Sequence, residues 1–210
     1  MRNFSYLALG DSYTIGELVS TEESFPSQAV RLLQAGTARD DNRKLGFDQP
    51  VIIAKTGWTT DELDEAIDAA AISNTFDMVS LLIGVNNQYR GRSVNEYKIQ
   101  FGHLLQRAIQ FAGNRNSRVF VLSIPDWGVT PFAAGQDRQG IARAIDAYNT
   151  SAAHICVQHQ VVFIDITTLQ RAVGDKDEFL AADGLHPSGK EYTKWAEKLV
   201  IEIKRVLAHG

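Results

Sequence analysis

Five short apolar runs recur along the chain and are separated by segments with helical periodicity. Each run is nearly continuously apolar rather than alternating, which is typical of strands buried on both faces of a parallel sheet. With 210 residues the chain is long enough for one domain with a substantial core. The pattern therefore predicts a single α/β domain with a mostly parallel sheet. The runs are Phe4–Leu9, Val51–Ala54, Met78–Ile83, Val119–Ile124 and Val161–Ile166.

The segments between the runs carry helix signals. A capping box, Thr59 with Glu62, predicts a helix through Ala70, and a second box predicts a helix from Ser93 to about Ala112. We expect the other helices over 26–35, after Asp137, and after Pro187, where Ser188 and Glu191 fit a third capping box.

Composition narrows the possible functions. The net charge of −4 argues against nonspecific nucleic-acid binding. Cys156 is the sole cysteine, so neither an intrachain disulfide nor a cysteine metal cluster can form, and the histidines show no metal-ligand spacing. No signal-peptide core and no run of ~20 apolar residues is present. We expect a cytoplasmic protein without a membrane span, metal or cofactor, although a removed leader would leave no trace in this sequence.

A serine directly follows the first predicted strand, in the segment Gly10-Asp11-Ser12. A glycine-flanked turn there would lift Ser12 off the end of the sheet and direct its hydroxyl toward a cleft. In open α/β sheets, sites form beyond the carboxyl ends of the strands. Ser12 is therefore the candidate nucleophile, and it requires a base and a site that stabilises an oxyanion.

The candidate base is His186, three residues after Asp183 in a short loop ended by Pro187. Such a loop can hold a carboxylate beside an imidazole and fix its tautomer. Backbone N–H groups of Ser12 and Gly57 and the amide of Asn86 are candidate oxyanion donors. Taken singly, these residues can equally cap a helix, end a strand or serve a turn. Their joint placement at strand ends and in the last loop favours one catalytic site.

These motifs resemble the conserved blocks of the SGNH hydrolases, the GDSL esterase/lipase superfamily. Gly10-Asp11-Ser12-Tyr13 matches the first block, with Tyr13 in place of leucine, and Gly57 matches the second. Gly84-Val85-Asn86 matches the third, with Asn87 where aspartate is usual, and Asp183–Pro187 matches the fifth. The order and spacing hold over nearly the whole chain.

The resemblance implies one SGNH/GDSL domain over residues 1–210, folded as a three-layer, flavodoxin-like αβα sandwich with a five-stranded, mostly parallel sheet. It also implies ester hydrolysis with Ser12 as nucleophile, His186 as base and Asp183 as its orienting acid. The oxyanion donors would be Ser12, Gly57 and Asn86. The asparagine at position 87, where the family usually has aspartate, leaves the donor Asn86 intact and puts in doubt only the contacts that hold Asn86 in place.

Substrate binding is less specified by the sequence. The aromatic residues that follow strand ends are candidates for the rim of a substrate pocket, namely Tyr13, Trp58, Tyr89 and Trp127. Arg90 and Arg92 could meet an anionic group of the substrate, but a solvated loop suits them better. Small acyl esters, acetylated carbohydrates and lysophospholipids all remain open as substrates, and nothing indicates an oligomeric state. The alternative function is a flavodoxin-like FMN- or phosphate-binding module at the turn after the first strand. That alternative explains neither His186 nor Asn86.

Overall fold

The computed structural model describes residues 3–37 and 46–209. At its centre lies a five-stranded sheet in the order β4-β2-β5-β6-β7, and every pair of neighbouring strands is parallel. Numbered by their own order in the chain, these strands run 2-1-3-4-5, which is the flavodoxin-like doubly wound order. The predicted five-stranded parallel sheet is confirmed. The strands are β2 (Tyr6–Asp11), β4 (Val51–Lys55), β5 (Met78–Leu82), β6 (Val119–Leu122) and β7 (Val162–Ile164).

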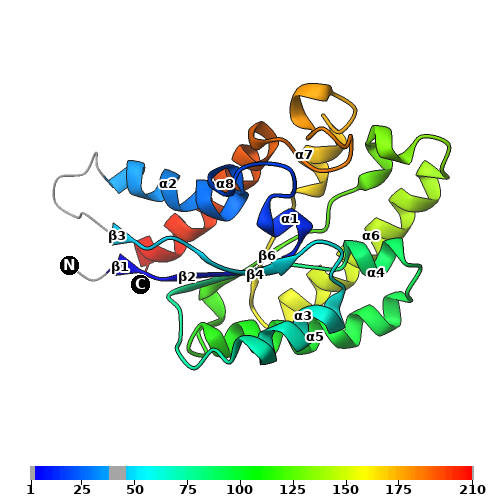
Figure 1. Cartoon of the computed structure of the whole chain (residues 1–210). Helices are drawn as coiled ribbons and strands as arrows, with labels where there is room; N and C mark the ends of the chain where they lie inside the picture. The colour runs from blue at the N-terminus through cyan, green and yellow to red at the C-terminus, as the bar shows by residue number, and fades with distance from the viewer. Residues whose placement is uncertain (1–2, 38–45, 210) are drawn as a thin grey trace.

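Helices cover both faces of this sheet and make the three layers visible in Figure 1. On one face, α2 (Phe25–Thr37) packs along α8 (Gly189–His209). On the other, α5 (Val94–Phe111) packs between α3 (Thr60–Ala70) and α6 (Arg138–Gln158). Such helical cover on both sides is what an all-parallel sheet requires, because its strands are apolar on both faces.

The strands differ in how completely they are buried. β2, β5 and β6 are buried along their whole length, as their continuous apolar runs predict. β4 is different, because Val51 is 46% exposed and none of its residues is fully buried. β4 forms an edge of the sheet and has a strand neighbour on one side only. The expectation of burial on both faces is therefore wrong for this strand.

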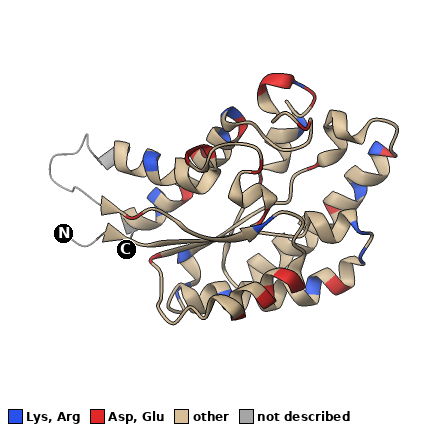
Figure 2. Ribbon diagram, viewed as in Figure 1, with Lys and Arg blue, Asp and Glu red and all other residues tan. Residues whose placement is uncertain are grey.

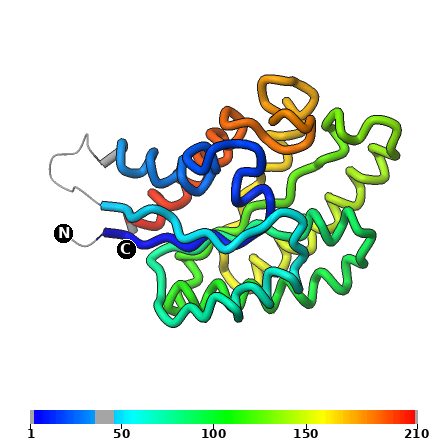
Figure 3. The backbone as a smooth tube through the Cα atoms, viewed as in Figure 1, coloured from blue at the N-terminus to red at the C-terminus, as the bar shows by residue number. Residues whose placement is uncertain are grey.

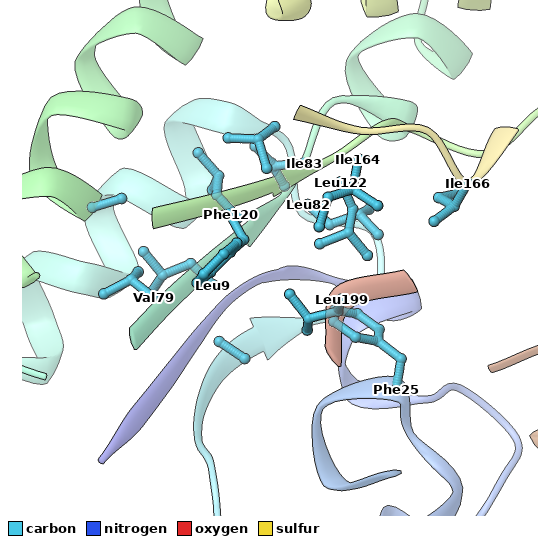
Figure 4. Close-up of a cluster of buried hydrophobic side chains, with 14 of the residues drawn as sticks. Leu9, Phe25, Val79, Leu82, Ile83, Phe120, Leu122, Ile164, Ile166 and Leu199 are labelled. Atoms are coloured by element: carbon cyan, nitrogen blue, oxygen red, sulfur yellow. The ribbon is translucent and has the colours of Figure 1, made fainter. Parts of the chain in front are cut away.

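The core is one contiguous cluster of aliphatic and aromatic side chains. Figure 4 shows part of it, where Phe25 of α2 and Leu199 of α8 meet residues of the central strands. Burying a side chain of this size contributes ~1.5–3 kcal/mol. This packing makes the sheet a rigid base for the loops at its edge.

The helix boundaries follow the predicted signals with one exception. Thr59 and Glu62 form the capping box of α3, and the side chains of Ser93 and Asp137 cap α5 and α6. The third predicted box does not form. The Ser188 hydroxyl instead donates to the Glu178 carbonyl, and the Glu191 carboxylate accepts from the Trp195 indole inside the core.

The remaining elements are short. β1 (Asn3–Phe4) leaves the main sheet and pairs in parallel with β3 (Gly46–Phe47), so the first apolar run is split between two sheets. α1 (Ser12–Ile15), α4 (Val85–Tyr89) and α7 (Thr167–Arg171) follow strands, and 3-10 turns occupy Thr21–Glu23, Asn116–Arg118, Trp127–Val129, Pro131–Ala133 and Asp177–Phe179.

The carboxyl ends of the strands all meet at one edge of the sheet, where α1 and α4 begin. The tube in Figure 3 shows the blue turn of α1 beside the orange segment that precedes α8, although almost the whole chain separates them in sequence. Both ends of the chain lie at the opposite edge. Figure 2 shows Lys, Arg, Asp and Glu concentrated on helices and loops, with the sheet itself almost free of them.

Candidate active site

Ser12 is the first residue of α1 and lies directly after β2. The preceding residue, Asp11, caps this single turn, because its Oδ1 accepts the Tyr13 N–H at 3.0 Å. Gly16 ends the turn at φ +76°, a left-handed conformation that glycine adopts without strain. The first N–H groups of a helix have no partner within it, so the Ser12 N–H points out of the turn as a donor.

Three side chains form a continuous hydrogen-bonded chain at this point. The Ser12 Oγ lies 3.0 Å from the His186 Nε2, and the His186 Nδ1 lies 2.6 Å from the Asp183 Oδ2. With the Nδ1 proton donated to Asp183, Nε2 is left as an acceptor for the serine hydroxyl. The structure thus brings together the three residues that the sequence singled out as nucleophile, base and orienting acid.

The Asp183 carboxylate is organised by its own loop. Its Oδ1 accepts the backbone N–H groups of Leu185 and His186, each at 3.0 Å. Partial burial tends to raise the pKa of Asp183, but the hydrogen bonds from the His186 ring and these two N–H groups outweigh it, and the pKa lies below its ordinary value. Asp183 is therefore ionised at neutral pH.

Gly57 lies in a tight turn after β4. The Trp58 N–H donates to the Lys55 carbonyl at 3.2 Å, and Gly57 stands at the third position with φ +84°. A positive φ there is the signature of a type II turn and requires glycine. The hydrogen bond of such a turn uses only its outer residues, so the Gly57 N–H remains outside it.

Asn86 and Asn87 are adjacent on α4 but have different surroundings. The Asn86 amide donates one hydrogen bond to the Trp58 carbonyl at 3.0 Å and lines the pocket beside Ser12. An amide has a second N–H, which remains for a ligand. Asn87 is fully buried and turns to α3, where it accepts the Thr60 N–H at 3.1 Å and donates to the Thr60 hydroxyl at 2.7 Å. Its position suits bracing, not substrate contact.

Comparison with known proteins identifies the relationship. The model of the GDSL-like lipase/acylhydrolase family matches residues 8–194. The chain belongs to this family. No curated protein matches its sequence significantly. The predicted resemblance is thereby confirmed. Membership of this family favours a hydrolase that acts on esters, and it does not favour the alternative, a cofactor-binding module.

Solved structures share the fold at low sequence identity. TesA is 20% identical, with a TM-score of 0.69, and the match covers 96% of this chain and 99% of TesA. The acetylxylan esterase Axe2 from Geobacillus stearothermophilus is 20% identical, with a TM-score of 0.71 and coverage of 95% and 94%. The psychrotrophic esterase EstA from Pseudoalteromonas sp. is 16% identical, with a TM-score of 0.69 and coverage of 98% and 100%.

In this member of the family, a cavity of ≈ 190 Å³ opens beside Ser12 and His186. Three of the four aromatic residues predicted at its rim do line it, namely Tyr13, Tyr89 and Trp127. Trp58 is not among the lining residues, and its half-buried side chain packs against the hydrophobic core. The residues that the sequence did not single out are Thr56, Val85, Phe132 and Leu185.

One wall of the cavity is aromatic. Tyr89 meets Trp127 edge-on with ring centroids 5.2 Å apart, and Phe132 lies 6.1 Å from Trp127. The Trp127 indole N–H donates to the Gln88 side chain at 2.7 Å, which fixes the ring plane. Tyr13, at the position where the family has leucine, is 2% exposed and lies 5.0 Å from the His186 ring. No sequence signal distinguished Phe132, since it follows a loop and not a strand end.

Asp11 is the second carboxylate near Ser12. It is fully buried, and its Oδ2 has no hydrogen-bond partner among the described residues. Burial raises the pKa of Asp11 to about 7, and the hydrogen bond from the Tyr13 N–H offsets this only in part. Asp11 and Asp183 therefore have opposite electrostatic surroundings within one site.

Two properties of residues 3–37 and 46–209 concern metal ions and membranes. No group of three or more His, Cys, Asp or Glu side chains there is arranged to hold a metal ion. None of the helices in those ranges combines the length and the apolar character needed to cross a membrane.

Proposed function

We propose that this chain is a serine esterase that cleaves a carboxylic ester through an acyl-enzyme intermediate. The observation that carries the proposal is the hydrogen-bonded series from Ser12 through His186 to Asp183, at a cavity also lined by Gly57 and Asn86. Nucleophile, base, orienting acid and oxyanion donors are the parts that acyl transfer by serine requires.

In the first half-reaction the Ser12 Oγ attacks the carbonyl carbon while its proton passes to the His186 Nε2. The carbonyl oxygen becomes an oxyanion held by the Ser12 and Gly57 N–H groups and the Asn86 amide. The intermediate collapses, the carbon–alkoxide bond breaks, and His186 protonates the departing alcohol. Water, deprotonated by His186, then attacks the acyl-enzyme and releases the carboxylic acid and Ser12.

The cavity supports a small acyl group as the part held beside Ser12. Its lining combines the aromatic wall of Tyr89, Trp127 and Phe132 with Val85 and Leu185. An aromatic wall suits either an apolar chain or the face of a sugar ring, so small acyl esters, acetylated carbohydrates and lysophospholipids remain the candidate classes. A chain-length series of p-nitrophenyl esters, beside an acetylated sugar and a lysophospholipid, distinguishes them through kcat/KM.

Covalent labelling tests the nucleophile directly. A fluorophosphonate probe should add one adduct to the wild-type chain, located on Ser12 by peptide mass spectrometry. Ser12→Ala should abolish both the adduct and ester turnover while the circular dichroism spectrum is kept. Thr14→Ser serves as the matched control, because it alters a nearby buried hydroxyl residue on α1 and should leave labelling intact. Labelling or turnover that survives Ser12→Ala would refute the assignment.

A further inference from the structure

Arg90 makes two contacts that connect α4 with the turn after β4. Its Nη2 donates to the Gly57 carbonyl at 2.7 Å, and its Nη1 pairs with the Glu62 Oε1 at 3.2 Å. Glu62 is itself held by the α3 capping box, where its Oε2 accepts the Thr59 N–H at 2.8 Å. The guanidinium therefore joins the Gly57 carbonyl to a fixed helix start, although the sequence favoured a solvated loop for this residue.

The Gly57 turn needs external support to act as a donor site. Glycine has the greatest backbone freedom of any residue, and the type II turn has only one internal hydrogen bond, from Trp58 to Lys55. An oxyanion donor works only when its N–H lies ~2.7–3.1 Å from the position of the developing charge. Gly57 has no side chain of its own to hold it, and residues with side chains rarely adopt φ +84°.

Two side chains hold this turn, one on each side of the Gly57 N–H. Thr56 donates its hydroxyl to the Glu17 carboxylate, and Arg90 holds the Gly57 carbonyl. The next carbonyl, that of Trp58, is held by Asn86. Asn86 lies in α4 and Arg90 directly follows the helix, four residues later, so the two side chains leave the same side of it. One helical turn thereby carries a proposed oxyanion donor and the support of a second one.

We infer that Arg90 is a positioning residue for the Gly57 donor of the oxyanion hole. The inference rests on the proposed esterase function and adds a residue to it. The arginine contacts no reacting atom. It holds the backbone of Gly57 where the N–H meets the oxyanion, and its planar guanidinium reaches both Gly57 and Glu62, which a single lysine ammonium cannot reproduce.

The test uses three variants in the full chain with p-nitrophenyl acetate. Because a misplaced donor acts mainly on the transition state, Arg90→Met and Arg90→Lys should each lower kcat by roughly 10- to 100-fold with little change in KM. Arg92→Met is the matched control. Arg92 also ties α4 to the first turn of α3, through Asp61 at 2.6 Å, but contacts neither Gly57 nor Trp58. It should keep kcat.

Two further measurements separate positioning from other roles. Free guanidinium ion should restore part of the kcat of a further variant, Arg90→Ala, because Arg90 is on the surface and its vacated position is open to solvent. A mono-p-nitrophenyl succinate, which is anionic, should suffer the same fold loss as the neutral acetate. A rise in KM at constant kcat, a loss confined to the anionic ester, or an equal loss in Arg92→Met would overturn the inference.

The fluorophosphonate experiment distinguishes the two failures. If Ser12 is labelled in the wild type and the Arg90 variants turn over normally, the role of Arg90 is wrong and the esterase proposal stands. If Ser12→Ala keeps full turnover, both are wrong. Thermal melting of each Arg90 variant excludes unfolding as the cause of a lost kcat.

Discussion

Two loops approach Ser12 from different parts of the chain, and they are held in different ways. The base loop, residues 181–187, is held largely by its own bonds: Asp183 accepts from Leu185 and His186, and the Ala181 N–H donates to the His186 carbonyl at 2.8 Å. The oxyanion loop, residues 56–60, is held mainly by side chains 27 to 39 residues away along the chain, three of them on or next to α4 and the fourth that of Glu17.

Because of this difference, the two loops should respond differently to substitutions. The base loop carries its geometry in a few adjacent residues, so damage there should stay local to the His186 ring. The oxyanion loop depends on several independent long-range hydrogen bonds, so it should fail in steps, with one loss for each contact removed. Each bond of this kind contributes ~0.5–1.5 kcal/mol to stability, and an orphaned buried partner costs ~1–3 kcal/mol.

The largest effect should come from the base loop. His186→Ala removes the proton acceptor of Ser12, and we expect kcat to fall by roughly 10⁴-fold or more, since such residues act as a unit with the nucleophile. Asp183→Ala should lose less, because the ring and its contact with Ser12 survive. Steady-state kinetics and a pH profile check both variants. A His186→Ala enzyme that keeps turnover would place the base elsewhere.

The next largest effect should come from Asn86, the residue of α4 that holds the oxyanion loop through the Trp58 carbonyl. Asn86→Ala removes a donor that acts on the developing charge, which typically costs ~10²–10³ in kcat with a smaller change in KM. The fluorophosphonate probe should still react at Ser12, more slowly. Should Asn86→Ala be nearly normal while Asn87→Ala is crippled, the third motif has been matched one residue out of register.

A substitution of Asn87 should lower the stability of the fold more than it lowers the rate of the reaction. Asn87→Ala leaves the buried Thr60 N–H without its partner, so we expect a loss of ~1–3 kcal/mol in the free energy of unfolding. For a chain of this length that lowers Tm by roughly 2–4 °C for each kcal/mol. Its kcat should fall less than that of Asn86→Ala. Asn87→Asp, which restores the usual family residue and can still accept from Thr60, should be tolerated.

The same contrast explains what the sequence could predict. Asp183, His186 and Pro187 are close in sequence, so their spacing alone indicated their contact. The continuous apolar runs indicated the parallel sheet for the same reason, since strand burial is a local pattern. Gly57 and Asn86 could be placed at strand ends, but nothing local indicated that Arg90 contacts Gly57, because that contact joins residues 33 positions apart.

Four other residues lie where their local sequence pattern did not place them. Trp58 comes after a strand end, as the cavity-lining aromatics do, yet its side chain turns to the core. Phe132 comes from a loop that the pattern left featureless, and it reaches the cavity beside Trp127. Ser188 and Glu191 at the start of the last helix fit a capping box, but the Ser188 hydroxyl donates to the Glu178 carbonyl and the Glu191 carboxylate accepts from the Trp195 indole one helical turn further on. In each case the packing of the surrounding elements, which the local sequence pattern does not encode, decides where the side chain lies.

The last comparison concerns the two carboxylates, which should give pH dependences of opposite sign. Burial raises the pKa of Asp11 from 3.8 to about 7 in the folded protein. Between those two values the folded chain retains a proton that the unfolded chain has lost, so stability falls as pH rises from ~4 to ~7. Asp183 has a pKa below its ordinary value, so its contribution is present above ~4 and is lost as pH falls further.

Asp11→Asn should remove the first dependence and leave the second. The asparagine Oδ1 can still accept the Tyr13 N–H, and no charge is then buried at high pH. We expect a Tm at pH 8 that is several degrees above wild type, because a shift of about three pKa units corresponds to at most ~4 kcal/mol. At pH 4 the two should melt together. The exposed Asp175→Asn, which removes the same charge from the surface, is the matched control and should leave the curve unchanged. If wild type and Asp11→Asn melt in parallel from pH 4 to pH 8, Asp11 does not carry a buried charge, and the electrostatic contrast between the two carboxylates is wrong.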